Sequence, residues 1–525
     1  MSALFSLVFS LVAVISSKIH FCGSVAAGIS DNYIHATWSF RDLLWLILVF
    51  GLTYAIMRFL EKVPADAIQK HKKIYPFKAC AVFFTCIVVS WLPYLLSFAP
   101  GSVLGDSISS ISQVLSGNYN NHHPFFYTLF VGLFIRIGTI LGNINIGIFL
   151  YTLTQYLILA ASLTYVLHFM YMNGLRTVIL VITLLYYCIM PFFPSYAIIM
   201  WKDPLFSCAL LHYSFICLEI LQNRTADHAK KLYLKYGLVS LLVVFLRNNG
   251  IFIIAGISII ILFFNIIKHI PVRAFFICTI CVLMLSFTVQ GPLYNIMGIE
   301  KPRVESLGIP LQQLAYTAVY ERDSLNNEEI DLLNNLLPID EYKSVYAPCR
   351  VDNLKWNPDF CTDYLNNNTK YILQSWLEML PRHSKSYIKS YLLETLGFWH
   401  PWLQNRYGYI DIYIADNQYN IINTDIIERL SGHSIQSYLK SFYPLLGSGT
   451  LFWIIVASFT LCIKRSKKIR CFFYLPAMFC WGTIMIATPV AFSLRYVYIF
   501  VLLLPLYITL PYLNNCRFSI KTRTR

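Results

Sequence analysis

Charged residues are scarce in this chain. Only 13% of its 525 residues are Asp, Glu, Lys or Arg, whereas 57% are hydrophobic and 16% are aromatic. A soluble domain of this size cannot hide so much apolar side chain, and many of the apolar runs approach the length that crosses a bilayer. The scarcity of charge therefore excludes a soluble protein and predicts an all-α, polytopic membrane protein.

Acidic residues are scarcer than basic ones, 26 against 41, which leaves a formal net charge of +15. This excess does not indicate nucleic-acid binding, because most of the cations cluster in short links beside apolar runs, the pattern of the positive-inside rule. A basic n-region is also lacking at the N-terminus, so 1–17 is interpreted as the start of a retained helix and not as a cleavable signal peptide.

The basic links predict the orientation of the chain. They lie at 62–78, 224–235, 268–273, 464–470 and 517–525, and we expect all of them in the cytoplasm. The apolar runs lie at 3–27, 42–60, 79–98, 125–140, 146–168, 177–198, 204–221, 236–248, 251–267, 274–292, 449–463, 471–492 and 496–513. The links 62–78 and 224–235 are both expected in the cytoplasm, so an even number of runs must cross the membrane between them. Five runs lie there, and one of them therefore does not cross. We expect the short run 125–140 to lie in the outer interface or to re-enter, which leaves about twelve transmembrane helices and two cytoplasmic termini.

The positive-inside rule also predicts that one long polar segment, 298–448, lies outside the cytoplasm, where we expect it to form a helical domain on the outer face. It holds Cys349 and Cys361, and a disulfide between them is left open because nearby thiols on an exported loop tend to oxidise. The predicted organisation is therefore a transmembrane module at 1–297 with an outer loop at 99–124, the extracytoplasmic segment 298–448, and C-terminal helices with a basic tail at 449–525.

Polar residues that are unusual in so apolar a chain gather on the predicted outer side. Asp106 begins a short stretch in which apolar residues recur at helical spacing, at Ile108, Ile111, Val114 and Leu115. This spacing predicts an amphipathic helix along the outer leaflet, with Asp106 near its N-terminus. A lone Asp in that place is most often a helix cap.

Further polar motifs reach the same predicted side. They are His122-His123, Lys202-Asp203, Arg247-Asn248-Asn249 and Arg495. Arg495 stands in a long apolar stretch, where a cation is costly unless it has an anionic partner, and a lipid-linked phosphate is the expected partner. Together with Asp106, these motifs predict an outward cavity with two carboxylates and several cations, which suits an anionic, lipid-bound substrate.

The order of these motifs resembles the GT-C superfamily of polytopic glycosyltransferases, which take sugars from polyprenyl-phosphate carriers. The segments that carry the resemblance are PGSVLGDS, NNHHPF, WKDPLF, LRNNG and SLRYVY. They are also similar to an uncharacterised bacterial membrane-protein family grouped with GT-C, and the size and plan are similar to phage and bacterial O-antigen glucosyltransferases. The chain departs from better-known members by two extra N-terminal helices, by one acid in the first loop where others have a pair, and by His-His-Pro in place of Lys-Pro-Pro.

The resemblance implies a role for each polar residue. Asp106 is the expected general base, which takes the proton from the acceptor hydroxyl as that oxygen attacks the anomeric carbon with inversion. Arg495 is the first choice for the lipid phosphate, because a guanidinium binds phosphate oxygens in a bidentate manner, and Arg247 and Lys202 follow. The expected substrate contacts are Asp203 (on Lys202 or the sugar hydroxyls), His122 and His123 (on the acceptor or the phosphate), Asn248 and Asn249. No cofactor is firmly implied, and two acids leave a divalent metal open.

The function implied is transfer of a sugar, with glucose favoured, from a polyprenyl-phosphate donor to a cell-surface glycan such as O-antigen, on the periplasmic face of a bacterial inner membrane. The expected partners are the bilayer, this donor and the glycan acceptor. An O-antigen polymerase or ligase is one alternative, and it predicts the key Arg and His residues in 298–448. A lipid-linked glycan transporter or flippase is another, and it predicts charges in mid-helix and a discontinuous helix. The exported tryptophans Trp356, Trp376, Trp399 and Trp402 either stack on saccharides or pack in a core.

Overall fold

The computed structural model describes residues 1–35, 37–65, 68, 76–222, 229–268, 273–299, 303–403, 412–441, 446–487 and 490–513. Helices dominate this part of the chain, and the strands within it form one short hairpin. The fold is thus α-helical in outline, as the composition predicts. Parts of the predicted basic links, including Lys70, Lys72, Lys73 and Arg224, lie outside the described residues, as does the tail 517–525.

Five helices among the described residues are long and apolar enough to cross a membrane, and one bent pair would make a sixth span. The five are α2 (Phe40–Lys62), the Phe77–Ser97 part of α3 (Pro76–Ser97), α6 (Ile144–Met172), α9 (Lys202–Gln222), and Ala274–Ile296, which runs through α12 (Arg273–Thr288), a π-helical turn (Val289–Leu293) and α13 (Tyr294–Ile296). The pair is α7 (Thr177–Ile189) and α8 (Phe192–Ile198), bent by 50°. The chain is therefore a multi-pass membrane protein.

The other helices of the bundle are shorter. They are α1 (Ser2–Ser17), α4 (Gly105–Ser116), α5 (Phe125–Ile140), α10 (Ala229–Leu246), α11 (Gly250–Lys268), α24 (Ser448–Lys464), α25 (Leu475–Ile486) and α26 (Ile499–Thr509), with 3-10 turns at Lys468–Phe473, Leu494–Val497 and Leu510–Tyr512. Helix length and composition in the described part support fewer spans than the expected twelve, so the twelve-helix topology and the cytoplasmic termini stay predictions.

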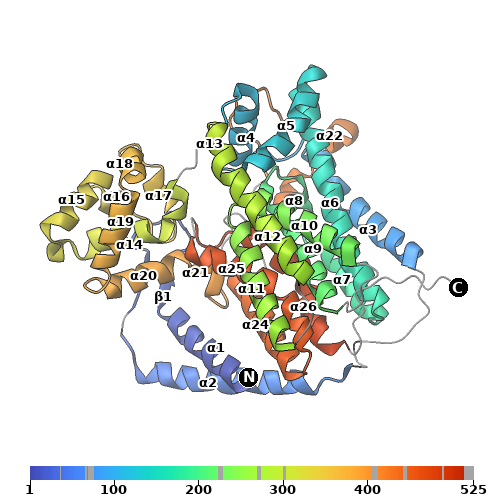
Figure 1. Cartoon of the computed structure of the whole chain (residues 1–525), viewed down its shortest axis with the longest axis horizontal. Coiled ribbons are helices and arrows are strands. Elements are labelled where there is room, and N and C mark those ends of the chain that lie inside the picture. The colour runs from blue at the N-terminus through green and yellow to red at the C-terminus, as the bar shows by residue number, and fades with distance from the viewer. Residues whose placement is uncertain are drawn as a thin grey trace.

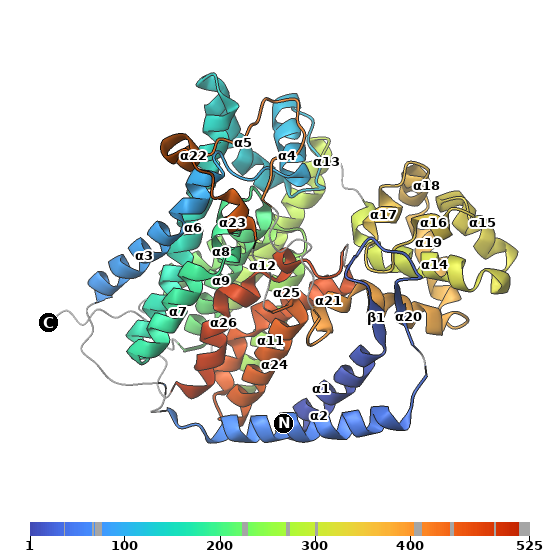
Figure 2. The same ribbon diagram turned by 180° about the vertical axis from the view of Figure 1, so that it is seen from behind.

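The first apolar run is shorter as a helix than expected. The predicted helix over 3–27 ends at Ser17, and β1 (Ile19–Phe21) then pairs antiparallel with β2 (Asn32–Ile34). The Nζ atom of Lys18 lies 2.5 Å from the carboxylate of Asp42, in the first turn of α2, so the helix end is tied to its neighbour. Figures 1 and 2 show α1 and α2 lying together along the lower edge of the molecule.

Helix α9 forms the centre of the bundle. Its apolar stretch is 89% buried, against 11% for α2, and it packs against α6, α10, α25 and α26. The continuous apolar core of the molecule includes residues from all of these helices. Because α9 begins at Lys202, a deeply buried helix of the bundle carries two of the predicted site residues at its first turn.

The two C-terminal runs differ from the expected spans. Where the sequence predicts helices over 471–492 and 496–513, α25 ends at Ile486 and α26 begins only at Ile499. Phe492 has a positive φ of 76°, and the Ala491 N–H donates to the Cys349 carbonyl at 3.0 Å. This hydrogen bond is incompatible with a helix through 491, and it ties the stretch that precedes Arg495 to the outer segment.

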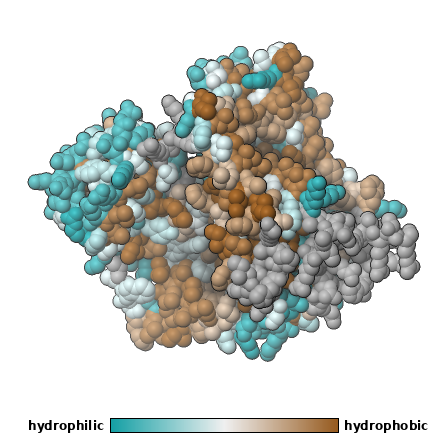
Figure 3. Space-filling model, in the orientation of Figure 1, coloured by the Kyte–Doolittle hydropathy of each residue, from teal (hydrophilic) through white to brown (hydrophobic). Residues whose placement is uncertain are grey.

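The segment 298–448 contains a separate helical lobe. Its helices are α14 (Gly308–Tyr320), α15 (Asn327–Leu336), α16 (Tyr342–Val345), α17 (Asp352–Lys355), α18 (Thr362–Asn367), α19 (Thr369–Met379) and α20 (Ser384–Glu394), with 3-10 turns at Arg303–Ser306 and Arg322–Ser324. The next helix, α21 (Leu396–Trp399), packs against α24 of the bundle. The lobe has its own apolar core, on which Ile19 and Ile34 of the N-terminal hairpin pack. Figure 3 shows that hydrophilic residues gather on this lobe, whereas the bundle surface is largely apolar.

The rest of the segment 298–448 returns to the bundle. Ile414 pairs with Val103 and Thr424 with Ala99, which places this stretch against the link between α3 and α4. Two short helices, α22 (Ile426–Ser431) and α23 (Gln436–Lys440), follow, and α22 lies beside α3 (Figure 1). Cys349 and Cys361 are free thiols, one buried and one exposed, so the structure does not contain the disulfide that the sequence left open.

Candidate functional site

One cavity of about 330 Å³ brings together the polar residues that the sequence singles out. It is lined by Asp106, His122, His123, Lys202, Asp203, Arg247, Asn248, Asn249 and Arg495. These residues come from α4, from the loop before α5, from the start of α9, from the α10–α11 turn and from the 3-10 turn before α26. The motifs are up to 389 positions apart in the sequence, and the fold gathers all of them.

Asp106 is positioned by backbone pairing between two links. The N–H of Ser102 donates to the Ile198 carbonyl and the N–H of Met200 donates to the Ser102 carbonyl, both at 2.9 Å. The Ser107 hydroxyl adds a hydrogen bond to the Met200 carbonyl at 2.7 Å. These contacts hold the first turn of α4 beside the first turn of α9, so Asp106 lies near Lys202.

Helix α4 has the amphipathic pattern that its sequence predicts. Ile111 and Val114 are buried and Leu115 is exposed, and α4 packs against α5. No side chain caps the first turn of α4, whose N-cap residue is Leu104, and the Asp106 carboxylate bonds elsewhere. The interpretation of Asp106 as a simple helix cap is therefore not supported.

Asp106 forms an ion pair with Arg495. The Arg495 Nη1 donates to Asp106 Oδ2 at 2.8 Å, and Nη2 donates to the Tyr496 hydroxyl at 3.1 Å. The guanidinium also lies 4.7 Å from the centre of the Trp201 ring. Arg495 thus has an anionic partner within the chain, as its apolar surroundings require, and the lipid phosphate that the sequence analysis expects as its partner stays a prediction.

The charge of Asp106 is strongly favoured in this environment. Burial by itself raises the pKa of the Asp106 carboxyl, but the nearby charges of Arg495 and Lys202 outweigh it, and the pKa lies below its usual range. The Asp106 side chain is still 39% exposed, so it can be reached from the cavity. Asp106 is therefore an ionised, accessible carboxylate at neutral pH.

The second acid has a different partner from the one expected. Asp203 is 1% exposed and pairs with Arg247, whose Nη1 lies 3.3 Å from Asp203 Oδ1. The same Arg247 nitrogen donates to the Tyr496 carbonyl at 3.1 Å, and the guanidinium lies 5.0 Å from the Tyr496 ring centre. Asp203 therefore holds Arg247 and does not pair with Lys202.

Lys202 contacts a histidine instead. Its Nζ lies 3.0 Å from Nδ1 of His123, a residue that is 3% exposed. Burial, followed by the charge of Lys202, lowers the pKa of His123 well below its usual range, so its ring is neutral and accepts from the ammonium. The His122 ring lies 4.4 Å from that of His123 and faces Glu305, with 3.6 Å between His122 Nδ1 and Glu305 Oε1.

The two asparagines of the α10–α11 turn connect neighbouring elements. The Asn248 side-chain amide donates to the Asn121 carbonyl at 3.2 Å, and the Asn121 amide donates to Asn248 Oδ1 at 3.3 Å. The Asn249 amide donates to the Thr483 hydroxyl of α25 at 2.7 Å. Both asparagines line the cavity, and both also fix the loop and the helix that form its walls.

Trp356 is the one residue that the sequence singled out in the part of the cavity wall that comes from the lobe. Glu305, Asp352 and Trp356 line it, and Lys355 lies 3.0 Å from both carboxylates. The spacing of Asp352 and Lys355 is that of an ion pair on a helix, which is a weak signal. Nothing in the sequence connects either residue with Glu305, because only the folded lobe brings the turn at Arg303–Ser306 beside α17.

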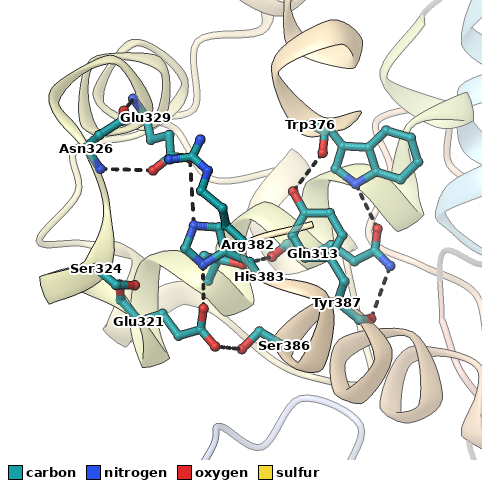
Figure 4. A network of polar contacts seen from close by, with 11 residues as sticks. Gln313, Glu321, Ser324, Asn326, Glu329, Trp376, Arg382, His383, Ser386 and Tyr387 are labelled. Carbon is teal, nitrogen blue, oxygen red and sulfur yellow. Dashed lines mark hydrogen bonds and ion pairs between the residues drawn. The ribbon is translucent and has the colours of Figure 1, made fainter. Parts of the chain in front are cut away.

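Arg382 and His383 belong to a different network within the lobe, drawn in Figure 4. Arg382 lies 2.5 Å from Glu329, and His383 contacts Glu321 through Nδ1 and lies 3.7 Å from Glu329 through Nε2. The Ser386 hydroxyl donates to the other Glu321 oxygen at 2.6 Å. None of these residues is among those that line the cavity.

Metal ligands do not cluster in the described part of the chain, where no group of three or more His, Cys, Asp or Glu side chains is arranged to hold an ion. In the cavity, Asp106 and Asp203 are each paired with an arginine. The cavity is therefore built as a set of ion pairs around an accessible carboxylate, an arrangement that can accept a proton and neutralise an anion.

The chain belongs to a protein family of unknown function (DUF6020), whose family model matches residues 115–523. The matched region contains every predicted site residue except Asp106, which lies nine positions before it. No curated protein matches the chain, and no solved structure does.

Proposed function

We propose that the protein is an inverting membrane glycosyltransferase of the GT-C type, which moves a sugar from a polyprenyl-phosphate carrier to a cell-surface glycan. The observation that supports this best is the cavity itself, in which an accessible Asp106 lies 2.8 Å from Arg495, with Lys202 and Arg247 in the same wall. A phosphate ester requires cations, and an acceptor hydroxyl requires a base. The cavity supplies both.

The Asp106–Arg495 pair connects the two requirements. A donor phosphate that enters the cavity competes with Asp106 for the Arg495 guanidinium, because both anions accept its N–H groups. Once the guanidinium turns to the phosphate, Asp106 loses an interaction that lowers its pKa and becomes a stronger base. Donor binding therefore prepares the carboxylate for the acceptor.

The transfer then occurs in one displacement. The acceptor oxygen forms a bond to the anomeric carbon, the bond from that carbon to the phosphate oxygen breaks, and the electron pair leaves with the lipid phosphate. The acceptor proton passes to Asp106, a step for which a positioned base typically contributes about 10²–10⁴-fold. Arg495 and Lys202 stabilise the negative charge that grows on the leaving phosphate.

The finer features of this proposal follow from the resemblance. They are glucose as the favoured sugar, O-antigen of lipopolysaccharide as the acceptor, a twelve-helix topology in a bacterial inner membrane, and a cavity open to the periplasm. A divalent metal is not required by this scheme, because Arg495 and Lys202 supply the positive charge at the phosphate.

A lipid-linked glycan transporter is the second candidate, and one observation favours it. Helices α7 and α8 form a broken pair bent by 50°, and discontinuous helices are typical of transporters. The residues at the break, Met190 and Pro191, are uncharged, and the charged residues lie together at the cavity instead. The polymerase or ligase alternative is weaker, because Arg382 and His383 of the lobe are paired with glutamates outside the cavity.

The purified protein in liposomes distinguishes these functions. We expect it to transfer labelled glucose from polyprenyl-phosphate glucose to membrane glycan from the cells that make it, with inversion at the anomeric carbon. Movement of labelled lipid-linked glycan across the bilayer without any transfer would favour the transporter. Growth of glycan chains from lipid-diphosphate repeat units would favour the polymerase.

A further inference from the structure

We propose that the lobe-side wall of the cavity, formed by Glu305, Asp352 and Trp356, is a binding subsite for a neutral saccharide of the acceptor glycan. This inference rests on the proposed transferase function and specifies which part of the cavity takes which substrate. It assigns the acceptor to residues of the lobe and leaves the cationic wall to the donor phosphate.

Trp356 has the exposure of a binding residue. Its side chain is 61% exposed although it lines a cavity, and its ring meets the edge of the His122 ring with 5.7 Å between the centres. The Trp376 indole instead stacks on Tyr387 and donates to Gln313, and Trp399 is buried. A large exposed indole in a concave wall presents an apolar face to a ligand, and the C–H face of a sugar ring fits such a face.

The two carboxylates beside Trp356 are held in place by one lysine. The Lys355 side chain is 2% exposed, and its Nζ lies 3.0 Å from Glu305 and from Asp352. Both carboxylates nevertheless keep accessible surface, 31% for Glu305 and 20% for Asp352. Oxygens that are already fixed lose little side-chain entropy when they accept hydrogen bonds from a ligand.

The charge of this wall selects the class of ligand. Two carboxylates and one ammonium leave a net charge of −1, which repels a phosphate but accepts hydroxyl donors. Acidic side chains together with an indole therefore suit a neutral, hydroxyl-rich ring. The opposite charge on the Arg495 and Lys202 wall suits the phosphate, so the cavity separates its two substrates by charge.

The position of the wall agrees with an acceptor that arrives from water. Figures 1 and 2 show α17 at the edge of the lobe that faces the bundle, and the lobe is the hydrophilic part of the molecule in Figure 3. A glycan chain reaches the cavity along this surface, whereas a lipid-linked donor reaches it from the apolar bundle. Each substrate thus approaches the wall that its chemistry fits.

Glycan binding without donor tests this subsite. The purified full-length protein in nanodiscs is applied to an array of neutral oligosaccharides that carry glucose, galactose and rhamnose. We expect the wild type to bind a subset of them and Trp356→Ala to bind these at least about tenfold more weakly. Trp356→Phe should retain part of the affinity, because a sugar ring can stack on any aromatic face but has the largest contact area with an indole. Asp352→Asn should weaken binding as well, because it removes a charged acceptor and releases Lys355.

Two variants serve as controls. Trp402→Ala removes another exposed tryptophan of the exported segment, one that does not line the cavity, and it should bind as the wild type does. Glu328→Gln, at an exposed position of α15 that does not line the cavity, should also bind glycan normally because it leaves the lobe-side wall intact. The subsite is disproved if the wild type binds none of the oligosaccharides or if Trp356→Ala binds them with unchanged affinity. Glycan binding that depends on Trp356, in a protein that transfers no sugar from the lipid donor, would disprove the proposed function and leave the subsite standing.

Discussion

At the scale of single residues, the ion pair between Asp106 and Arg495 has the largest consequences. The Arg495 Nη1 lies 2.8 Å from Asp106 Oδ2, so each side chain neutralises the charge of the other. A substitution of either one therefore changes both the removed group and its former partner. The predictions for these two residues take this coupling into account.

Asp106→Asn should lower the turnover number by about 10²–10⁴-fold, because the amide cannot accept the acceptor proton. The carbonyl oxygen of the introduced amide can still accept a hydrogen bond from Arg495, so the thermal unfolding temperature should change little. Donor affinity should stay the same or increase, because the guanidinium no longer has a competing carboxylate. Turnover, donor binding and melting are measured on the same preparation, and wild-type turnover in this variant would remove Asp106 from the chemistry.

Arg495→Ala should move the acid limb of the kcat/KM profile to higher pH. In the wild type, neighbouring cations hold the pKa of Asp106 below its usual range, so the carboxylate stays ionised well into the acid range. Loss of the guanidinium leaves the burial effect, which raises the pKa, so Asp106 becomes protonated at a higher pH than before. Arg495→Lys keeps the charge and should leave the acid limb near its original place, although donor binding recovers only in part.

The profile is measured on the residual activity of each variant. Identical acid limbs in the wild type and in Arg495→Ala would show that this ion pair does not control the protonation of the base.

Arg247→Ala should destabilise the folded protein by about 3–5 kcal/mol, since it leaves the Asp203 carboxylate buried without its partner. The side chains of Arg247 and Asp203 are 10% and 2% exposed, so water cannot replace the lost contact. Unfolding in detergent by denaturant measures the effect, and Arg247→Lys should restore part of it. A stable Arg247→Ala variant with weak donor binding would instead place Arg247 directly at the phosphate.

At the scale of secondary-structure elements, α20 ends in an unusual residue. Glu394 is fully buried, and neither of its oxygens has a hydrogen-bond partner among the described residues. Burial raises the pKa of Glu394 well above its usual range, so the folded protein favours the protonated form of this carboxyl. The end of α20 thus holds an acid in the interior of the lobe, where its charged form is disfavoured.

Glu394→Gln should remove a pH dependence of stability. When folding raises the pKa of a carboxyl, the group does not lower the unfolding free energy at pH values below its unfolded-state pKa. As the pH rises from the unfolded-state pKa to the folded-state pKa, the unfolding free energy falls by about 1.4 kcal/mol per pH unit. The unfolding free energy of the variant relative to the wild type should therefore increase as the pH rises above the ordinary pKa of a glutamate. Glu328→Gln, at an exposed position of α15, is the control and should show no such shift. Equal pH dependence in all three proteins would show that Glu394 is ionised in the folded state.

The elements near the cavity were the most predictable from the sequence. Helices α4 and α5 occupy the predicted amphipathic stretch and the predicted run 125–140, because short-range periodicity and flanking Pro and Gly residues determine them. The region around Arg495 was not predictable in this way. Its course depends on the bond from Ala491 to the Cys349 carbonyl, a tertiary contact that leaves no periodic signal.

The residues of the candidate site likewise fall into those that the sequence could predict and those that it could not. Unusual charges in apolar surroundings indicated Asp106, Lys202 and Arg495, since an isolated charge is costly there. Glu305 and Asp352 stand in a polar segment where a charge is ordinary, so their sequence positions carried no information. The pairing of side chains was not predictable either, since the sequence leaves Lys202 or the sugar hydroxyls as partners of Asp203, which pairs with Arg247 in the structure.

At the scale of the whole molecule, the shared cavity constrains the topology. Asp106, Asp203, Asn249 and Trp356 all line it, so they must open to one compartment whichever side that is. Reporter fusions at these four residues should all read the outer compartment, and fusions at Lys231 and Lys467 the cytoplasm. A cytoplasmic signal at all four would reverse the proposed orientation. Outer signals at some of the four residues and cytoplasmic signals at others would contradict their position in one cavity.

The stretch 412–441, which closes over the link between α3 and α4, has a consequence for the synthesis of the protein. Ser102 bonds to Tyr413 and Ser97 to Gln436, and Arg495 follows Asp106 by 389 positions. At about 5–20 residues per second, roughly 20–80 seconds pass between the synthesis of the carboxylate and that of its guanidinium. During that interval the nascent chain has Asp106 but lacks both the 412–441 stretch and the guanidinium that pairs with the carboxylate. On the proposed function, a ribosome that stalls before the last helices leaves an inert fragment in the membrane, unable to consume the lipid carrier.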